Sequence, residues 1–139
     1  REAIARMAKA GVVATLLPGT TFFLAESEYA PARRFMDTGV KVAIATDFNP
    51  GSSMMQSMPF VMSLACLYMG MTVAEVFISA TYCAAKSLGK EGVVGSLLPG
   101  KQADLVLWNL RTLEEIPYHI ADNRVLAVVK KGKIVYETS

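Results

Sequence analysis

The chain has 139 residues, of which 53% are hydrophobic and 19% are charged, and its formal net charge is +2. This charge is too small, and the basic residues too scattered, to indicate nucleic-acid binding. No apolar run reaches the ~18–20 residues that span a bilayer, and the first ten residues lack the apolar core of a signal peptide. We therefore expect neither nucleic acid nor membrane as a partner. The chain begins with Arg instead of Met, which fits an internal start.

The two cysteines, Cys66 and Cys83, lie inside helical patterns and outside any CxxC spacing. This arrangement predicts buried free thiols in a reducing compartment and favours the cytoplasm.

The first part of the chain has the pattern of a strand, a helix and a second strand. Residues 1–10 are expected to end a helix, and the apolar run 12–17 is typical of a parallel strand covered on both faces. Residues 18–21 are expected to form a loop, and Pro31 to open a helix that stops at Gly39. The next apolar run, 40–46, predicts the second strand of a βαβ unit.

Two helices are expected next. Ser57 is placed to cap a helix over 58–69, whose methionines recur at helical spacing and indicate core packing. Thr72 and Glu75 form a capping box that predicts a second helix continuing to Leu88.

The composition changes near residues 89–93, where we expect a boundary between an α/β part and a small β module. Residues 103–108 and 125–129 have strand composition. Lys131-Gly132 predicts a hairpin turn into a strand over 133–136.

Asp47 follows the second predicted strand directly, and Asn49, Gly51 and Ser52 follow it within five residues. Ligands bind at the carboxyl ends of strands in parallel α/β architectures, so this carboxylate offers a metal ligand or proton acceptor. An Asx turn explains Asp47 as well, and Asn-Pro-Gly is good turn chemistry whatever it binds. From residue types alone the turn is the simpler interpretation of Asp47.

His119 is the only histidine. It lies in the β module, so we expect a surface or core-edge side chain there instead of a metal ligand. The loop expected at 18–21 sits at the other strand end, where it can line the pocket, and receives no assigned role.

Three stretches resemble the amidohydrolase superfamily of metal-dependent hydrolases. Residues 95–108 carry the pattern G-S-L-x-P-G-K-x-A-D-L-V, which is similar to the β element after the last barrel helices of that superfamily. Residues 81–89 resemble the preceding helix, and residues 129–136 resemble the closing hairpin.

A narrower resemblance is to the imidazolonepropionase family, and it rests on residues 45–52, 13–19 and 117–120. It implies an α/β fold: the C-terminal part of a TIM-type (β/α)8 barrel plus part of a small β-sandwich-like domain. Residues 1–91 would supply the last βα units of the barrel, and residues 92–139 would belong to the small domain. The chain would then correspond to about the last third of such an enzyme.

The resemblance also implies a reaction: 4-imidazolone-5-propanoate and water give N-formimidoyl-L-glutamate in histidine degradation. Asp47 would ligate a single zinc or iron ion and accept a proton from the attacking water. Asn49, Gly51 and Ser52 would contact the substrate. With Asn-Pro-Gly-Ser attached to Asp47, this functional interpretation is favoured over the turn.

A catalytic zinc needs about three protein ligands. The family supplies a His-x-His pair and a later histidine besides the aspartate, and no such histidines occur in this chain. Alone it is expected to bind metal weakly, to be inactive, and to aggregate or dimerise through exposed edges. Its expected partners are the small-molecule substrate, the rest of the barrel and a second copy in a full-length homodimer.

Two alternatives stay open. Another amidohydrolase, such as a purine, pyrimidine or triazine aminohydrolase, would keep Asp47 and the 95–108 pattern. A non-catalytic scaffold derived from the same fold would need neither the metal nor the missing histidines.

Overall fold

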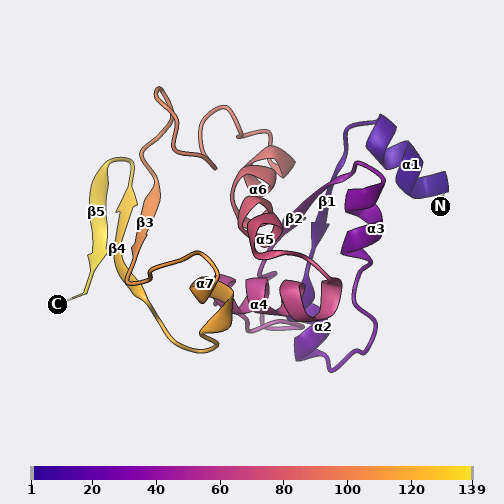
Figure 1. The fold of residues 1–139 in the computed structure, drawn as a ribbon, viewed down its shortest axis with the longest axis horizontal. Helices are drawn as coiled ribbons and strands as arrows, with labels where there is room; N and C mark the ends of the chain where they lie inside the picture. The colour runs from indigo at the N-terminus through magenta and orange to yellow at the C-terminus, as the bar shows by residue number, and fades with distance from the viewer. Residues whose placement is uncertain (1, 139) are drawn as a thin grey trace.

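The computed structural model describes residues 2–138 and is drawn in Figure 1. An α/β part holds the N-terminus, a small antiparallel sheet holds the C-terminus, and the two termini lie at opposite ends of the long axis.

The α/β part is built on a two-stranded parallel sheet. Strands β1 (Val13–Leu16) and β2 (Lys41–Ile44) pair with Val13 opposite Lys41 and Leu16 opposite Ile44. Helix α3 (Ala32–Asp37) connects them, with Pro31 at its N-cap position. This parallel pairing confirms the predicted βαβ unit. The expected cover on both faces of the first strand is wrong, because Ala14 and Leu16 are buried while Thr15 is exposed.

Two further helices belong to this part. Helix α1 (Glu2–Lys9) precedes β1, as expected. The loop expected at 18–21 is wrong: helix α2 (Pro18–Phe23) follows β1 directly, with Pro18 in its first turn. Proline is already in helical φ at that position. The ring of Phe22 then packs edge to face on Phe60, with centroids 5.3 Å apart, which holds α2 against the next helix.

Helix α4 (Met58–Met69) follows β2 after a long loop. The Ser57 side chain accepts a hydrogen bond from the Phe60 amide at 3.3 Å, and Gly70 closes the helix in the left-handed conformation. The predicted cap and the predicted core role of the methionines are confirmed, since Met62 and Met69 are buried.

The helix expected from Thr72 to Leu88 is interrupted. The capping box of Thr72 and Glu75 starts α5 (Val73–Ala80), and α6 (Tyr82–Ser87) begins after a break at Thr81. The Thr81 hydroxyl donates to the Phe77 carbonyl at 2.7 Å, and its backbone leaves the helical region at φ −119° and ψ −87°. Such back-bonding by Thr competes with the helical ladder and bends helices.

An ion pair joins α3 to the start of α5. Arg33 donates to both carboxylate oxygens of Glu75, at 2.9 and 2.8 Å, and Glu75 also accepts from the Thr72 amide at 2.8 Å. The Arg33 hydrogen bonds, reinforced by the Thr72 amide, lower the pKa of Glu75 to about 2. The capping carboxylate thus also fixes the packing of two helices.

One hydrophobic core covers the sheet. Its buried members come from both strands and the residues beside them, from α3, α4 and α5, and from Ile116 in the C-terminal part: Ala14, Leu16, Ala32, Val40, Val42, Ile44, Val61, Met62, Ala65, Met69, Met71, Val76 and Ile116. Both cysteines are free, Cys83 buried and Cys66 half-buried, and burial raises the pKa of each thiol.

The β module is a three-stranded antiparallel sheet in the order β3 (Leu105–Trp108), β4 (Val125–Lys130) and β5 (Lys133–Glu137). The predicted hairpin is confirmed, with Lys131 and Gly132 at φ 52° and 75° in its turn.

A short helix that the sequence pattern did not predict, α7 (Glu115–Tyr118), docks the module on α4. Ile116 enters the core, and the buried Ser63 hydroxyl lies 2.5 Å from the Pro117 carbonyl. The two parts are therefore packed together through α7. The boundary near residues 89–93 stays a prediction.

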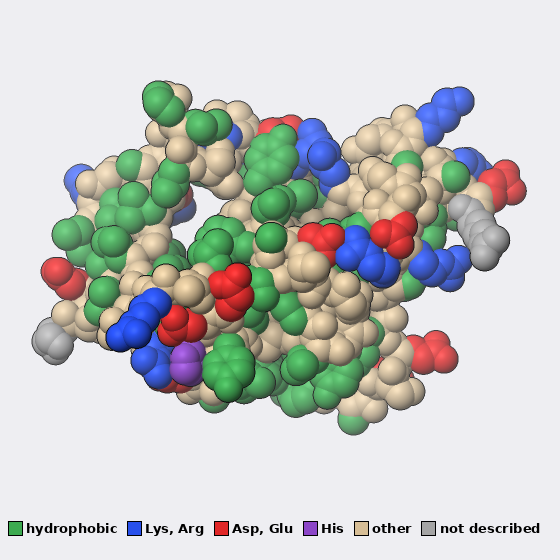
Figure 2. All heavy atoms as spheres, viewed as in Figure 1, with side chains coloured by type: hydrophobic (Ala, Val, Ile, Leu, Met, Phe, Trp, Pro, Cys, Tyr) green, Lys and Arg blue, Asp and Glu red, His purple; other side chains and the backbone are tan. Residues whose placement is uncertain are grey.

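Much of the surface of the β3–β5 sheet is uncovered. Figure 2 shows hydrophobic side chains gathered on the β3–β5 end and an opening between that end and the helices α5 and α6. Ile134 and Val135 on β5 are each 62% exposed. Within residues 2–138 β1 and β2 pair only with each other, so this stretch does not close a barrel. No helix in the same stretch is long and apolar enough to cross a membrane.

Candidate metal and substrate site

The two parallel strands bring two polar side chains to one edge of the sheet. Thr20 lies in α2, which follows β1, and Asp47 lies just beyond β2. The Thr20 hydroxyl donates to Asp47 Oδ2 at 2.9 Å. The two strand ends, 27 residues apart in sequence, thus meet at one carboxylate.

Asp47 sits at a sharp bend in the chain. Its φ of +51° is in the left-handed region, which aspartate tolerates better than most residues. Its side chain is half-buried, and among residues 2–138 only Thr20 donates a hydrogen bond to the carboxylate. Oxygen Oδ1 is therefore left with unused acceptor capacity.

The loop after Asp47 is organised by the side chain of Asn49. Its Nδ2 donates to the Asp47 carbonyl at 2.7 Å and to Ser52 Oγ at 3.1 Å. Its Oδ1 accepts from the Gly51 and Ser52 amides at 2.9 and 2.8 Å. The turn chemistry that the sequence indicated is present, and it engages most of the hydrogen-bonding capacity of Asn49.

Ser53 is a structural residue of this loop that the sequence analysis missed. It is fully buried, donates from Oγ to the Thr46 carbonyl at 3.1 Å, and pairs with Asn49 in an isolated antiparallel bridge. No pattern in Ser52-Ser53 distinguishes the buried serine from its half-buried neighbour, so no sequence signal would have found it.

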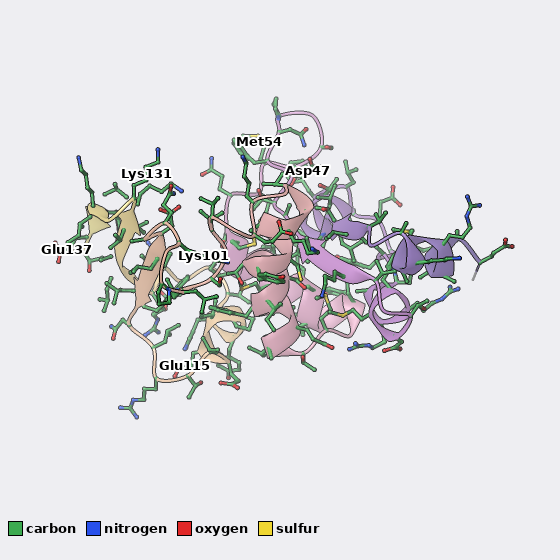
Figure 3. All side chains as sticks on the ribbon, turned by 90° about the horizontal axis from the view of Figure 1, so that it is seen from above. Asp47, Met54, Lys101, Glu115, Lys131 and Glu137 are labelled. Carbon is green, nitrogen blue, oxygen red and sulfur yellow. The ribbon has the colours of Figure 1, made fainter. Side chains whose placement is uncertain are left out.

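Large apolar side chains are exposed on the segments next to Asp47 and Thr20. Phe48 is 49% exposed and Met54 is 54% exposed, and Figure 3 shows Asp47 and Met54 together at one margin of the molecule. Phe22 and Phe23 of α2 are also exposed. Apolar groups around a few polar ones are typical of a small-molecule site or of a surface covered by further polypeptide.

The structure brings Asp47, Asn49, Gly51 and Ser52 into one loop, as the sequence predicted, but it brings no histidine to them. His119 ends α7, where its ring lies edge-on to Tyr118 and its Nε2 is 3.8 Å from Glu115. Within residues 2–138 no three His, Cys, Asp or Glu side chains are grouped to hold a metal ion. The loop over residues 47–53 contributes a single carboxylate, that of Asp47.

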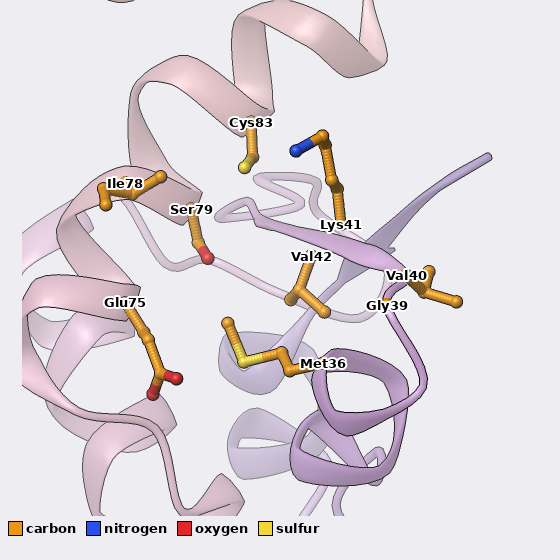
Figure 4. A pocket seen from close by; sticks show the side chains of 9 residues that line it. All are labelled: Met36, Gly39, Val40, Lys41, Val42, Glu75, Ile78, Ser79 and Cys83. Carbon is orange, nitrogen blue, oxygen red and sulfur yellow. The ribbon is translucent and has the colours of Figure 1, made fainter. Parts of the chain in front are cut away.

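A separate concavity of about 310 Å³ lies beside the amino end of β2, between α3, α5 and α6 (Figure 4). Val42 and Ile78 line it, with the thiol of Cys83. Ser79 Oγ is buried there without a hydrogen-bond partner in the part of the chain described. This pocket is at the opposite end of the strand from Asp47, so it does not contribute to the candidate site.

Comparison with known proteins agrees with this fold. The model of the amidohydrolase family matches residues 2–135, and the chain belongs to that family. Within the family, the chain is 54% identical over 134 residues to an imidazolonepropionase of Geobacillus kaustophilus. It is 46% identical over 136 residues to an imidazolonepropionase of Alkaliphilus metalliredigens.

These alignments include 96% and 98% of the chain but only 31% and 32% of the relatives. The chain thus spans about a third of the length of the proteins it matches.

Solved structures also match nearly the whole of this chain over about a third of their own length. A zinc-bound adenosine deaminase from Xanthomonas campestris matches with a TM-score of 0.86 and 28% identity, over 96% of this chain and 34% of that one. An atrazine chlorohydrolase from Arthrobacter aurescens, complexed with zinc, matches with a TM-score of 0.86 and 22% identity, over 98% and 34%. At that identity the second likeness shows the fold alone.

Proposed function

We propose that this chain is the C-terminal portion of an imidazolonepropionase, which hydrolyses 4-imidazolone-5-propanoate to N-formimidoyl-L-glutamate in histidine degradation. In this reaction water forms a C–O bond to the ring carbonyl carbon, the cyclic amide C–N bond breaks, and a proton passes from water to the leaving nitrogen. The observation that carries the proposal is the half-buried carboxylate of Asp47 at the end of β2. The 54% identity supports the choice of substrate.

In this proposal residues 1–91 supply the last βα units of a TIM-type barrel, and residues 92–139 part of a small β-sandwich-like domain. Two observations support it. Within residues 2–138 strands β1 and β2 each pair along one edge only, and the β3–β5 sheet is largely uncovered, so both sheets need further polypeptide to pair with or to cover them. The exposed hydrophobic side chains of β5 fit the same explanation.

Asp47 fits one position of a metal site. Its carboxylate has one oxygen held by Thr20 and the other unused, and zinc and iron both accept a carboxylate ligand. When bound, the ion supplies Lewis acidity that makes water a stronger nucleophile near neutral pH. Asp47 then serves as ligand and as acceptor of the proton that water loses on attack.

Asn49, Gly51 and Ser52 remain our proposed substrate contacts. Because Asn49 is engaged within its own loop, its first contribution is to fix the loop shape. The exposed Gly51 backbone and the Ser52 hydroxyl are then presented beside Asp47, where a polar five-membered ring or its opened product would bind.

The remaining metal ligands must come from polypeptide outside this chain, so the chain alone is expected to bind the ion weakly and to be inactive. We further expect the complete enzyme to be a cytoplasmic homodimer without nucleic-acid or membrane partners.

The proposal is tested by expressing the complete protein that contains this chain and assaying two classes of substrate. Hydrolysis of 4-imidazolone-5-propanoate with no turnover of guanine, adenosine or a triazine is the expected result. The solved neighbours include a deaminase of adenosine and a chlorohydrolase of atrazine, so turnover of such rings instead would favour an aminohydrolase. No activity and no bound metal would favour a non-catalytic scaffold.

A further inference from the structure

Thr20 contacts Asp47 but is not one of the predicted site residues. Its hydroxyl is the only hydrogen-bond donor to the Asp47 carboxylate within residues 2–138, and the two residues come from different strand–loop units. The bond measures 2.9 Å and is partly buried, which makes it a charge-assisted bond shielded from competing water.

The segment that holds Thr20 is tightly fitted. Pro18 and Gly19, which precede it in α2, are both buried. A Cβ added to Gly19 would lie 3.1 Å from Met55 Cγ and 3.5 Å from Val61 Cγ2. The close packing leaves the first turn of α2 little room to move, so the backbone that carries the Thr20 side chain is held in place.

The backbone of Asp47 is fixed from the other side. Asn49 Nδ2 donates to its carbonyl at 2.7 Å, and the buried Ser53 donates to the carbonyl of Thr46. The remaining freedom of the carboxyl group is rotation about its own bonds, and for an aspartate this final torsion is broad. A single fixed donor on one oxygen removes that freedom.

We propose that Thr20 is a positioning residue for Asp47: its hydroxyl holds Oδ2 so that Oδ1 stays available to bind the metal ion. This inference rests on the proposed function of Asp47. Hydrogen bonds from neighbouring residues to metal ligands fix the orientation of those ligands. Their loss generally costs about 10–100-fold in metal affinity or activity.

The experiment uses the complete protein with Thr20→Val, which keeps the shape and removes the hydroxyl, and Thr20→Ser, which keeps the hydroxyl. The neighbouring Thr21→Val is the matched control, because the Thr21 hydroxyl makes no hydrogen bond within the described part of the chain. The two readouts are zinc affinity of the metal-free protein, by competition with a chromogenic chelator, and kcat and KM for ring opening.

Thr20→Val is expected to lose about 10–100-fold in zinc affinity and in kcat, with KM little changed. Thr20→Ser and Thr21→Val are expected to stay within about threefold of wild type, as hydroxyl retention predicts. Should Thr20→Val not fold, Thr20→Ala removes the same hydroxyl without adding a methyl to the site and is measured instead.

A double-variant comparison separates this inference from the proposed function. On an Asp47→Ala background, Thr20→Val is expected to lower zinc affinity no further, because its effect passes through the carboxylate. A full additional loss there, or wild-type zinc affinity and kcat in Thr20→Val alone, overturns the positioning role. Unchanged activity and zinc affinity in Asp47→Ala overturns the proposed function instead.

Discussion

Gly95 is the position where a single added methyl group should damage this fold most. Its φ is +86°, and a Cβ built there would lie 2.6 Å from the Ala85 Cβ and 2.9 Å from the Thr81 carbonyl oxygen. The left-handed conformation costs an alanine about 1–2 kcal/mol. Forcing a methyl against α6 adds about 1–3 kcal/mol, because backbone atoms cannot rotate away. We therefore expect Gly95→Ala to lower the free energy of unfolding by about 2–5 kcal/mol.

Two other glycines separate the contributions. Gly100 has the same φ of +86° with nothing within 4 Å of an added Cβ, so Gly100→Ala should cost only the conformational part, about 1–2 kcal/mol. Gly92 has open space and no left-handed φ, so Gly92→Ala should be neutral to slightly stabilising. Urea unfolding of the complete protein, followed by circular dichroism, measures all three. Equal losses for Gly95→Ala and Gly100→Ala would refute the steric argument.

Two further predictions concern contacts between elements. The carboxyl of Glu75 has its pKa lowered from 4.5 to about 2, so its stabilising effect is complete above pH 4.5 and lost as the pH falls through 2. The urea midpoint of wild type should therefore fall toward that of Glu75→Gln between pH 5 and 2, whereas parallel curves would contradict the Arg33 pairing. Ser63→Ala should leave the Pro117 carbonyl without its buried donor and cost about 1–3 kcal/mol. Faster proteolysis around α7 would accompany that loss, and unchanged urea stability would disprove the contact.

Local patterns predicted the strands and the candidate carboxylate. The apolar runs 12–17 and 40–46, joined by a helical segment, predicted a parallel βαβ pair. Parallel pairing puts Asp47 at the edge of the sheet where ligands bind in such architectures. The hairpin at Lys131-Gly132 was predicted in the same way, since glycine readily adopts the positive φ that the turn requires.

Contacts between distant segments decided what the sequence could not predict. Helix α2 forms where a loop was expected because Phe22 packs on Phe60, 38 positions further along. The break at Thr81 coincides with the close approach of Gly95, and neither residue signals the other in sequence. Periodicity contains no information of this kind.

At the candidate site, too, the sequence could not predict a contact between distant residues. The Thr20–Asp47 hydrogen bond joins residues 27 apart, and threonine at a strand end has no pattern that marks it as a partner of a carboxylate. The local turn at Asn49, by contrast, was visible in Asn-Pro-Gly.

We propose that the Asp47 carboxylate holds the catalytic ion and takes the proton from water. Asp47→Asn tests it in the complete enzyme, because asparagine tolerates the left-handed backbone and still accepts from Thr20. We predict a folded protein that has lost about 10²–10⁴-fold in hydrolysis of 4-imidazolone-5-propanoate, together with weakened zinc or iron binding. Wild-type turnover with a full complement of metal in this variant would contradict the account.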